Sequence, residues 1–341
     1  MLMPQIITRN APSVQGHWQK ELANAIKSPT QLLQAVGLSA EDLGNDYIAK
    51  QDFPTLVPLP FVARMRSGDR HDPLLLQVLP LQAEHVQQPG YVQDPLEEHD
   101  TAAPGLLHKY KSRVLLMLKT ACAVNCRYCF RRHFPYQENS VSKRDWQQAV
   151  DYIAARPEIN EVILSGGDPL MAKDEHLAWL LSQLEGINHL TRLRIHTRLP
   201  VVIPSRLTPE LIARLQQSRF NVVMVLHINH SNEIDDVLRK KLQPARSAGI
   251  HLLNQAVLLK GINDNLASMV ALSETLFDAG VMPYYLHLLD KVSGAAHFDT
   301  PTHLAQELIQ QMLLELPGFL VPKLVREVAG EGSKTPQDIF S

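Results

Sequence analysis

The chain has 341 residues, 45% hydrophobic and 20% charged, as expected of an ordinary soluble globular protein. Its 33 Lys and Arg nearly balance 35 Asp and Glu, so no bulk charge favours a nucleic-acid backbone or an anionic membrane. No stretch approaches the roughly 18 consecutive apolar residues of a spanning helix, and the start lacks the apolar core of a secretory signal. We therefore expect a cytoplasmic protein with neither nucleic-acid nor membrane partners.

Residues 1–105 predict a mostly helical and irregular N-terminal segment. Ser28 or Thr30 is a candidate cap for an apolar run of helical period, which Gly37 ends. Three prolines between residues 54 and 60 then interrupt any regular element. A polar, turn-rich connector follows before the texture of the sequence changes.

Six short apolar runs, alternating with segments of helical spacing, follow the connector. Such units predict parallel strands with helical crossovers. Because the runs are apolar throughout, we expect both faces of the sheet to be buried, as in a barrel or a doubly wound α/β sheet. The predicted strands are 114–118, 162–164, 193–196, 222–228, 252–258 and 284–289.

All three cysteines of the chain lie in "KTACAVNCRYCFRRHFPY" (119–136), as Cys122, Cys126 and Cys129. They are too close together for a disulfide framework, and thiolates on one loop after a strand indicate a metal. One interpretation is a tetrahedral zinc site completed by His133. Another is a [4Fe–4S] cluster held by three thiolates, which leaves one iron open to a ligand.

A second motif, "VILSGGDPL" (162–170), ends the next predicted strand in Gly166 and Gly167. Glycines without a Cβ allow a close backbone approach to a ligand. Taken alone, the motif is also compatible with a strand-to-helix turn capped by Asp168.

The cysteine spacing, with Tyr128 directly before the last cysteine, resembles the signature of the radical S-adenosylmethionine superfamily. The resemblance implies a [4Fe–4S] cluster whose open iron chelates the methionyl part of S-adenosylmethionine, which is cleaved to a 5′-deoxyadenosyl radical. It also implies that the backbone at Gly166 and Gly167, next to Asp168, receives the methionyl amino group. Gln255 is a further cofactor-binding candidate.

Several longer stretches together resemble the lysine 2,3-aminomutase family from about residue 50 onward. The fold implied is a partial (β/α)6 barrel over residues 106–300, with a C-terminal segment, 301–341, that closes the site. The stretches are "DPLLLQVLP" (72–80), "HKYKSRVLLMLKTACAVNCRYCFRRHF" (108–134), "TRLPVVIPSRLT" (197–208), "HINHSNE" (227–233), "NQAVLLKGINDN" (254–265), "PYYLHLLDKVSGAAHF" (283–298) and "VPKLVREVAGEGSKTP" (321–336).

The family resemblance implies a second cofactor, pyridoxal phosphate, bound through Lys334 in "GEGSKTP". Without the resemblance, Lys334 would read as a solvated residue of a terminal tail. Arg113 matches a phosphate ligand of the family, and Lys109 stands where a companion arginine is expected. A lysine there keeps the charge but loses the bidentate fork. The alternative for both is an ordinary basic strand edge.

The implied substrate is lysine. Arg131 matches the family's ligand for the substrate carboxylate, although adjacent Arg132 leaves an ambiguity. Asp290 and Glu327 match the two acids that hold the distal ammonium, where the family usually has aspartate at the second position. Because a buried ion pair depends on good geometry, the extra methylene of Glu327 predicts poorer turnover of free lysine.

The implied product is (R)-β-lysine, formed with electrons from a donor such as flavodoxin or ferredoxin. The short chain resembles the bacterial branch linked to translation elongation factor P and its lysyl ligase. Two alternatives are a radical-dependent RNA-modifying enzyme and a zinc-bearing interaction module. Histidines in these motifs are interpreted as core or supporting residues and not as a second metal site: His227, His230, His287 and His297.

Overall fold

A single curved sheet organises the protein, whose computed structural model describes residues 15–48, 52–98, 102–134 and 142–339. The strands follow one another in chain order across the sheet; β2 to β8 are parallel, and β1 and β9 are antiparallel at the edges. The strands are β1 (Leu106–Tyr110), β2 (Arg113–Lys119), β3 (Glu161–Gly166), β4 (Arg192–Thr197), β5 (Asn221–His227), β6 (His251–Val257), β7 (Met282–His287), β8 (Lys323–Arg326) and β9 (Thr335–Pro336).

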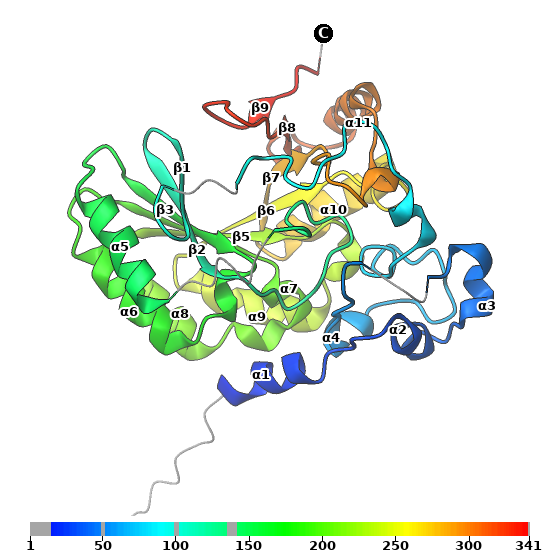
Figure 1. The fold of residues 1–341 in the computed structure, drawn as a ribbon, viewed down its shortest axis with the longest axis horizontal. Helices are drawn as coiled ribbons and strands as arrows, with labels where there is room; N and C mark the ends of the chain where they lie inside the picture. The colour runs from blue at the N-terminus through cyan, green and yellow to red at the C-terminus, as the bar shows by residue number, and fades with distance from the viewer. Residues whose placement is uncertain (1–14, 49–51, 99–101, 135–141, 340–341) are drawn as a thin grey trace, which may run out of the picture.

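Helices cross from each strand of the parallel sheet to the next, and they cover one face of it (Figure 1). Several begin with a side-chain cap that satisfies an otherwise unpaired backbone N–H. In α5, for example, Ser142 and Asp145 form a reciprocal capping box, with Ser142 N donating to Asp145 Oδ2 at 2.7 Å. The crossover helices are α5 (Lys143–Ala154), α6 (Asp174–Glu185), α8 (Pro209–Gln216), α9 (Asp236–Ser247), α10 (Leu266–Asp278) and α11 (Thr302–Glu315).

The predicted α/β class and all six predicted parallel strands are confirmed, as β2 to β7. The sheet does not close, because β1 and β9 end the strand order at opposite edges. This is the open, partial barrel that the sequence predicts. Strands β1, β8 and β9 were not predicted, and β8 extends the parallel set beyond the expected six.

The N-terminal segment packs against the barrel rather than forming a separate core. Its helices are α1 (Gln15–Ala23), α2 (Pro29–Ala35), α3 (Ala40–Leu43) and α4 (Leu59–Val62). The predicted helix that ends at Gly37 is α2. Buried side chains of this segment, including Phe61 and Leu74, belong to the same apolar cluster as the strands.

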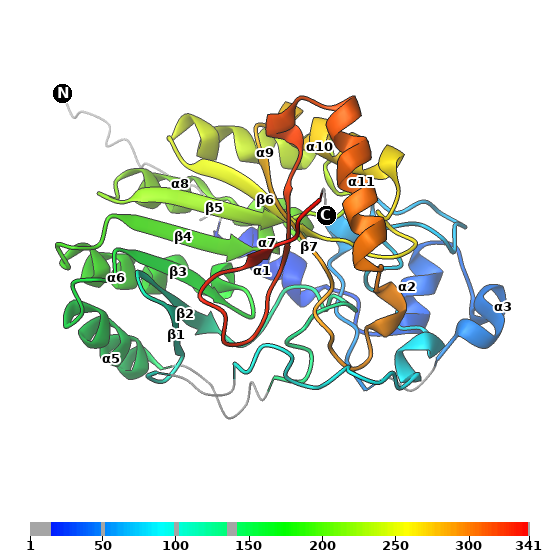
Figure 2. The ribbon, with the colours of Figure 1, turned by 90° about the horizontal axis from the view of Figure 1, so that it is seen from above.

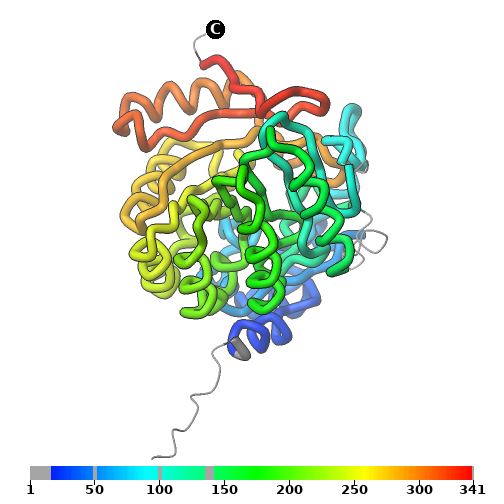
Figure 3. Tube along the Cα trace, turned by 90° about the vertical axis from the view of Figure 1, so that its left-hand side faces the viewer, coloured from blue at the N-terminus to red at the C-terminus, as the bar shows by residue number. Residues whose placement is uncertain are grey.

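The first and the last described segments lie at opposite sides of the molecule (Figure 3). The N-terminal helices lie at the bottom of that view, and the C-terminal segment crosses the top. After α11, β8 pairs with β7, and the chain then turns back so that β9 pairs with β8. Seen from above in Figure 2, the loop between β8 and β9 extends across the sheet, which brings the C-terminal residues to its open face.

Candidate active site

The inner face of the sheet encloses a cavity of about 520 Å³. Side chains of the parallel strands line it, most of them at alternate positions, as the period of a β-strand requires. Polar and charged side chains lie among apolar ones on this face, so the strand sequences are not apolar throughout. The strand residues that line the cavity include Arg113 and Leu115, Glu161 and Ser165, Arg192, Arg194 and His196, His227, Gln255, Tyr285 and His287.

The cysteine loop follows β2, and Cys122, Cys126 and Cys129 all line the cavity. The loop is held from the N-terminal segment: Asn125 N donates to Leu56 O at 3.0 Å, and Arg127 N donates to Gln77 O at 2.9 Å. A small apolar cluster that includes Phe298 packs against Tyr128 and Phe130 of the loop.

The thiols of the loop lie close to one another, and the three cysteines are half-buried. Burial raises the pKa of Cys122, and burial together with the nearby Cys126 raises the pKa of Cys129 to about 11. Buried thiols that repel each other as anions need a cation to ionise them. His133 is not among the described residues that line the cavity, and its Nε2 lies 3.0 Å from the carbonyl oxygen of Ser293. This arrangement gives no support to a Cys3His zinc site.

The paired glycines fix the position of the cysteine loop. Gly166 has φ of 115°, and a Cβ there would lie 2.6 Å from Lys119 O. A Cβ at Gly167 would lie 2.5 Å from Ala121 O, while Gly167 N donates to Lys119 O at 2.7 Å. The close backbone approach that these glycines permit is thus made to the loop itself, with both residues lining the cavity.

Asp168 lies at the cavity wall, and its carboxylate is occupied by protein donors. It accepts hydrogen bonds from Thr197 Oγ1 at 2.8 Å and from the backbone N–H groups of Arg198 and Leu199, each at 2.8 Å. It also caps the turn after β3, accepting from Leu170 N at 3.0 Å. Burial raises its pKa despite these hydrogen bonds. The capping role that the sequence allowed for Asp168 is therefore present.

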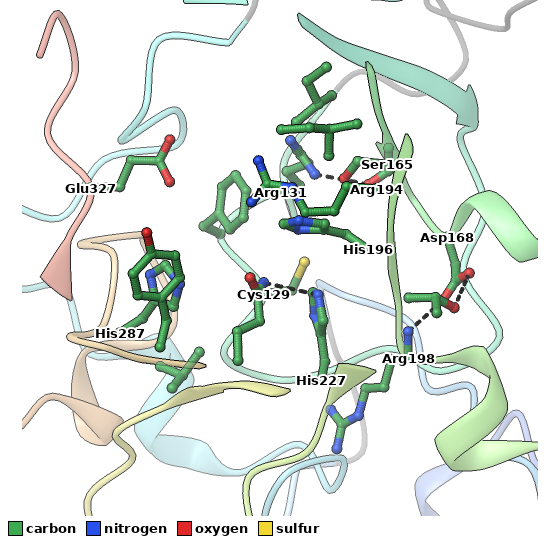
Figure 4. Close-up of a pocket in the computed structure, with 18 of the residues that line it drawn as sticks. Cys129, Arg131, Ser165, Asp168, Arg194, His196, Arg198, His227, His287 and Glu327 are labelled. Carbon is green, nitrogen blue, oxygen red and sulfur yellow. Dashed lines mark hydrogen bonds between the residues drawn. The ribbon is translucent and has the colours of Figure 1, made fainter. Parts of the chain in front are cut away.

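Arg131 points into the cavity (Figure 4) and is anchored by its own chain. Its Nε donates to Glu98 Oε2 at 2.7 Å, and its Nη1 donates to Gly166 O at 3.0 Å. Glu98 also accepts from Lys109 Nζ at 3.2 Å. Burial favours the neutral form of Glu98, but the charges of Arg131 and Lys109 outweigh burial and lower its pKa.

Lys109 is not among the described residues that line the cavity. Its ammonium is bound by Glu98 and by the carbonyl oxygen of Leu96, at 3.0 Å. Arg113 lines the cavity, with its guanidinium 3.9 Å from the centre of the Tyr110 ring.

Arg132 is buried on the other side of the cysteine loop. Its Nη2 donates to Glu84 Oε2 at 2.6 Å, and the same carboxylate accepts from Arg127 Nε at 2.7 Å. Of the two adjacent arginines, Arg131 is among the described lining residues and Arg132 is not.

Lys334 reaches the cavity from the C-terminal loop and forms an ion pair with Glu327. Tyr110 donates to the second oxygen of Glu327 at 3.2 Å. Burial favours the neutral acid at Glu327, but Lys334 outweighs it and lowers the pKa. Asp290 is close enough to Glu327 for the two carboxylates to repel each other. Burial, followed by this repulsion, raises the pKa of Asp290 to about 7. One end of the cavity therefore holds two acids, one with a raised pKa and one with a lowered pKa.

Two basic residues of β4 that sequence reasoning missed also face the cavity. Arg194 forms an ion pair with Glu161, and Arg192 Nε lies 3.3 Å from Glu161 Oε2. The signal that would have found them is the period-2 spacing of Arg192, Arg194 and His196, which places all three on one face of the strand.

Three histidines line the cavity, including His196, which the sequence did not single out. Burial lowers the pKa of His196 and His287, and lowers that of His227 to about 3. The imidazoles are therefore neutral at physiological pH. His230 instead caps a turn, with Nδ1 accepting from Asn232 N at 3.1 Å. His297 is outside the described lining and packs on Phe298.

Several buried polar atoms that belong to lining residues have no hydrogen-bond partner within the described part of the chain. Protein interiors rarely leave such atoms unpaired, because each one carries a desolvation cost. Their position indicates that a polar ligand belongs in the cavity. The atoms are Arg194 Nε, His196 Nε2, Arg198 Nε, Gln255 Oε1, His287 Nε2 and Asp290 Oδ1.

Residues 117–271 match the Radical SAM superfamily, which covers the cysteine loop and the strands from β3 to β6. The fold and the cysteine loop together define a radical SAM protein. The chain is 52% identical to an L-lysine 2,3-aminomutase of Escherichia coli (strain K12), over 99% of this chain and 98% of that protein. It therefore belongs to the L-lysine 2,3-aminomutase family.

More distant relatives carry the same name. The chain is 52% identical to an L-lysine 2,3-aminomutase of Haemophilus influenzae over 94% of this chain, and 34% identical to that of Clostridium subterminale over 94% of this chain and 77% of that protein. These findings favour the aminomutase prediction over an RNA-modifying enzyme and over a zinc module. In the part of the chain that the structure describes, no helix combines the length and apolar character needed to cross a membrane.

Proposed function

We propose that this chain is an enzyme, an isomerase that converts L-lysine to (R)-β-lysine by migration of an amino group. The observation that carries the proposal is a single cavity lined by the three-cysteine loop, by the primary amine of Lys334, and by cationic and acidic side chains at separate positions. The chain that forms it is 52% identical to a curated L-lysine 2,3-aminomutase.

Cys122, Cys126 and Cys129 would hold a [4Fe–4S] cluster, with its open iron available to S-adenosylmethionine beside Gly166 and Gly167. Lys334 would hold pyridoxal phosphate. The half-buried, mutually repelling thiols and the unpaired polar atoms of the cavity fit these groups. When bound, the cluster with S-adenosylmethionine supplies an adenosyl radical and pyridoxal phosphate supplies an aldehyde for the amino group.

The charges of the chain suit a diamino acid. Arg131 offers a guanidinium for the substrate carboxylate, oriented by Glu98 and Gly166 O. Asp290 and Glu327 offer two carboxylates for the distal ammonium, and Glu327 already accepts a primary ammonium from Lys334. A glutamate substrate would place its own side-chain carboxylate against these acids and would be repelled.

For the phosphate we propose Arg113 with Arg194 in place of the predicted pair with Lys109. Arg194 lines the cavity and retains an unpaired Nε, whereas Lys109 is bound to Glu98. The neutral histidines can orient ligands without adding charge. One of them is His227, whose Nε2 lies 2.9 Å from Gln255 Nε2. The loop between β8 and β9 passes over the open face of the sheet (Figure 2), where Lys334 lines the cavity.

The role of Lys334 is tested by the substitution K334A in protein purified without oxygen. We expect the variant to retain iron and sulfide at the level of the unmodified protein, to lose bound pyridoxal phosphate, and to form no β-lysine. K323A, which removes an exposed lysine of β8, is the matched control and should keep both cofactors. Full retention of pyridoxal phosphate in K334A would refute the assignment.

We further propose that the product serves the modification of translation elongation factor P, through its lysyl ligase, in the cytoplasm, with flavodoxin or ferredoxin as electron donor. The family membership supports this role. Mass spectrometry of elongation factor P from cells with and without this protein provides the test. An unchanged mass of the factor in cells that lack the protein would separate the proposed chemistry from the proposed role.

A further inference from the structure

Arg198, the residue that directly follows β4, contacts the cysteine loop from within the protein. It is 6% exposed, and its Nη1 donates to Cys126 Sγ at 2.7 Å and to the hydroxyl oxygen of Tyr128. A positively charged donor is thus directed at a sulfur of the loop, in surroundings with little water to screen it.

The other side of the guanidinium is fixed by two fully buried partners. Its Nη2 donates to Gln77 Oε1 at 2.7 Å and to Glu233 Oε2 at 3.0 Å. Gln77 is held in turn, because its Nε2 donates to Pro73 O at 3.0 Å.

Glu233 is also fixed, since its Oε1 accepts from the backbone N–H groups of Asn229 at 2.9 Å and His230 at 3.1 Å. Asn229 completes the arrangement: its Nδ2 donates to Gln77 Oε1 at 2.9 Å and to the Tyr128 hydroxyl at 2.6 Å. The guanidinium therefore has one geometry, which three separate parts of the chain impose.

We propose that Arg198 is a positioning residue that orients Cys126 and raises the reduction potential of the cluster. A hydrogen bond to a cluster sulfur disperses negative charge, and a nearby positive charge favours the added electron. Glu233 opposes this effect, because its negative charge partly offsets that of Arg198. The pair thus sets the ease with which the cluster takes up the electron that starts each reaction.

This inference rests on the proposed cluster, and its test measures the cluster directly. Full-length protein with a reconstituted cluster is titrated with dithionite and mediator dyes, and the reduced cluster is quantified by electron paramagnetic resonance. In R198Q we expect the ratio of reduced to oxidised cluster at the wild-type midpoint to fall about tenfold, which corresponds to ~59 mV for a one-electron couple. In E233Q the midpoint should move in the opposite direction.

R206K is the matched control for loss of a buried arginine. Arg206 is fully buried, donates to the carbonyl oxygens of Leu170 and Ala172, and is not among the described lining residues. Its midpoint should match that of the unmodified protein. R198K keeps the positive charge but loses the two-pronged guanidinium, so its midpoint potential should fall by less than that of R198Q.

Two outcomes overturn the inference: R198Q with full iron content and an unchanged midpoint, or a shift of the same sign in R198Q and E233Q. If R198Q assembles no cluster, the midpoint potentials of R198K and E233Q test the inference instead. Unchanged midpoints in both variants overturn the inference. Absence of iron from the unmodified protein after reconstitution would instead contradict the proposed function.

Discussion

At the scale of single residues, Asp290 is a group whose ionisation the cavity alters strongly. Its pKa is raised to about 7, mainly by burial, while the nearby Glu327 is kept ionised by Lys334. A protonated Asp290 cannot attract an ammonium ion. The binding of lysine should therefore strengthen as pH rises through about 7, where Asp290 becomes a carboxylate.

We expect D290N to reduce kcat/KM for lysine by roughly 100-fold, as loss of one partner of a buried charge pair costs about 3 kcal/mol. The variant should also lose the rise of kcat/KM near neutral pH. Steady-state assays of β-lysine across pH 6 to 9 provide the measurement. Cleavage of S-adenosylmethionine by dithionite-reduced enzyme should persist; loss of both reactions would indicate a structural role. D278N, at an exposed aspartate at the end of α10, is the control.

Ionised Asp290 also lowers the stability of the folded protein. A carboxyl whose pKa is higher in the folded than in the unfolded chain contributes stability below its unfolded pKa of about 4, and this contribution is lost as pH rises through about 7. D290N should therefore melt at a higher temperature than the unmodified protein above neutral pH and lose that advantage near pH 4. Thermal unfolding at both pH values tests this sign.

At the scale of secondary-structure elements, prediction depended on the length and composition of each run. The strands β2 to β7 contain enough apolar residues to be recognised, whereas β8 is only "KLVR" and β9 only "TP", so pairing with a neighbour defines them. The cysteines could be predicted because they lie in one local motif, whereas Lys334 was predicted only from the family resemblance of longer stretches. Glu98 could not, since it lies in a polar stretch that reads as a connector and is buried only in the folded chain.

The contact between the end of β3 and the cysteine loop leads to a prediction for G167A. A Cβ at this position would lie 2.5 Å from a backbone oxygen and 2.9 Å from a backbone nitrogen of Ala121, so the loop must shift. We expect the variant to fold but to retain less than about half of the iron of the unmodified protein after reconstitution, given how strictly backbone contacts resist overlap. G318A adds a Cβ where the structure shows no atom within 4 Å. Equal iron in G167A and G318A would contradict this reading of the glycine motif.

At the scale of the whole molecule, the site is assembled from distant parts of the chain. Leu56 and Gln77 hold the cysteine loop, the strands supply the walls, and Glu327 and Lys334 arrive from the last part of the chain. The sequence predicts a mostly helical and irregular N-terminal segment up to residue 105, next to the barrel. The shared apolar core shows that this segment and the barrel are buried together.

A fragment that begins at residue 106 contains every cysteine and every strand but lacks the two backbone acceptors that hold the cysteine loop. It would also expose the apolar surface that Phe61 and Leu74 cover. We expect this fragment to be aggregated or to bind no cluster, as judged by size-exclusion chromatography and iron content. A monodisperse fragment with full iron would show that the N-terminal segment is dispensable for the site.

Beneath the cysteine loop, Arg127 and Arg132 share the single carboxylate of Glu84. Two cations against one anion leave a positive excess of one in this buried group. This positive charge would act as a counter-ion for the thiolates of the cysteine loop, and the polypeptide supplies it before iron binds. Folding of the loop is thereby coupled in advance to the negative charge of the inorganic centre that it is built to receive.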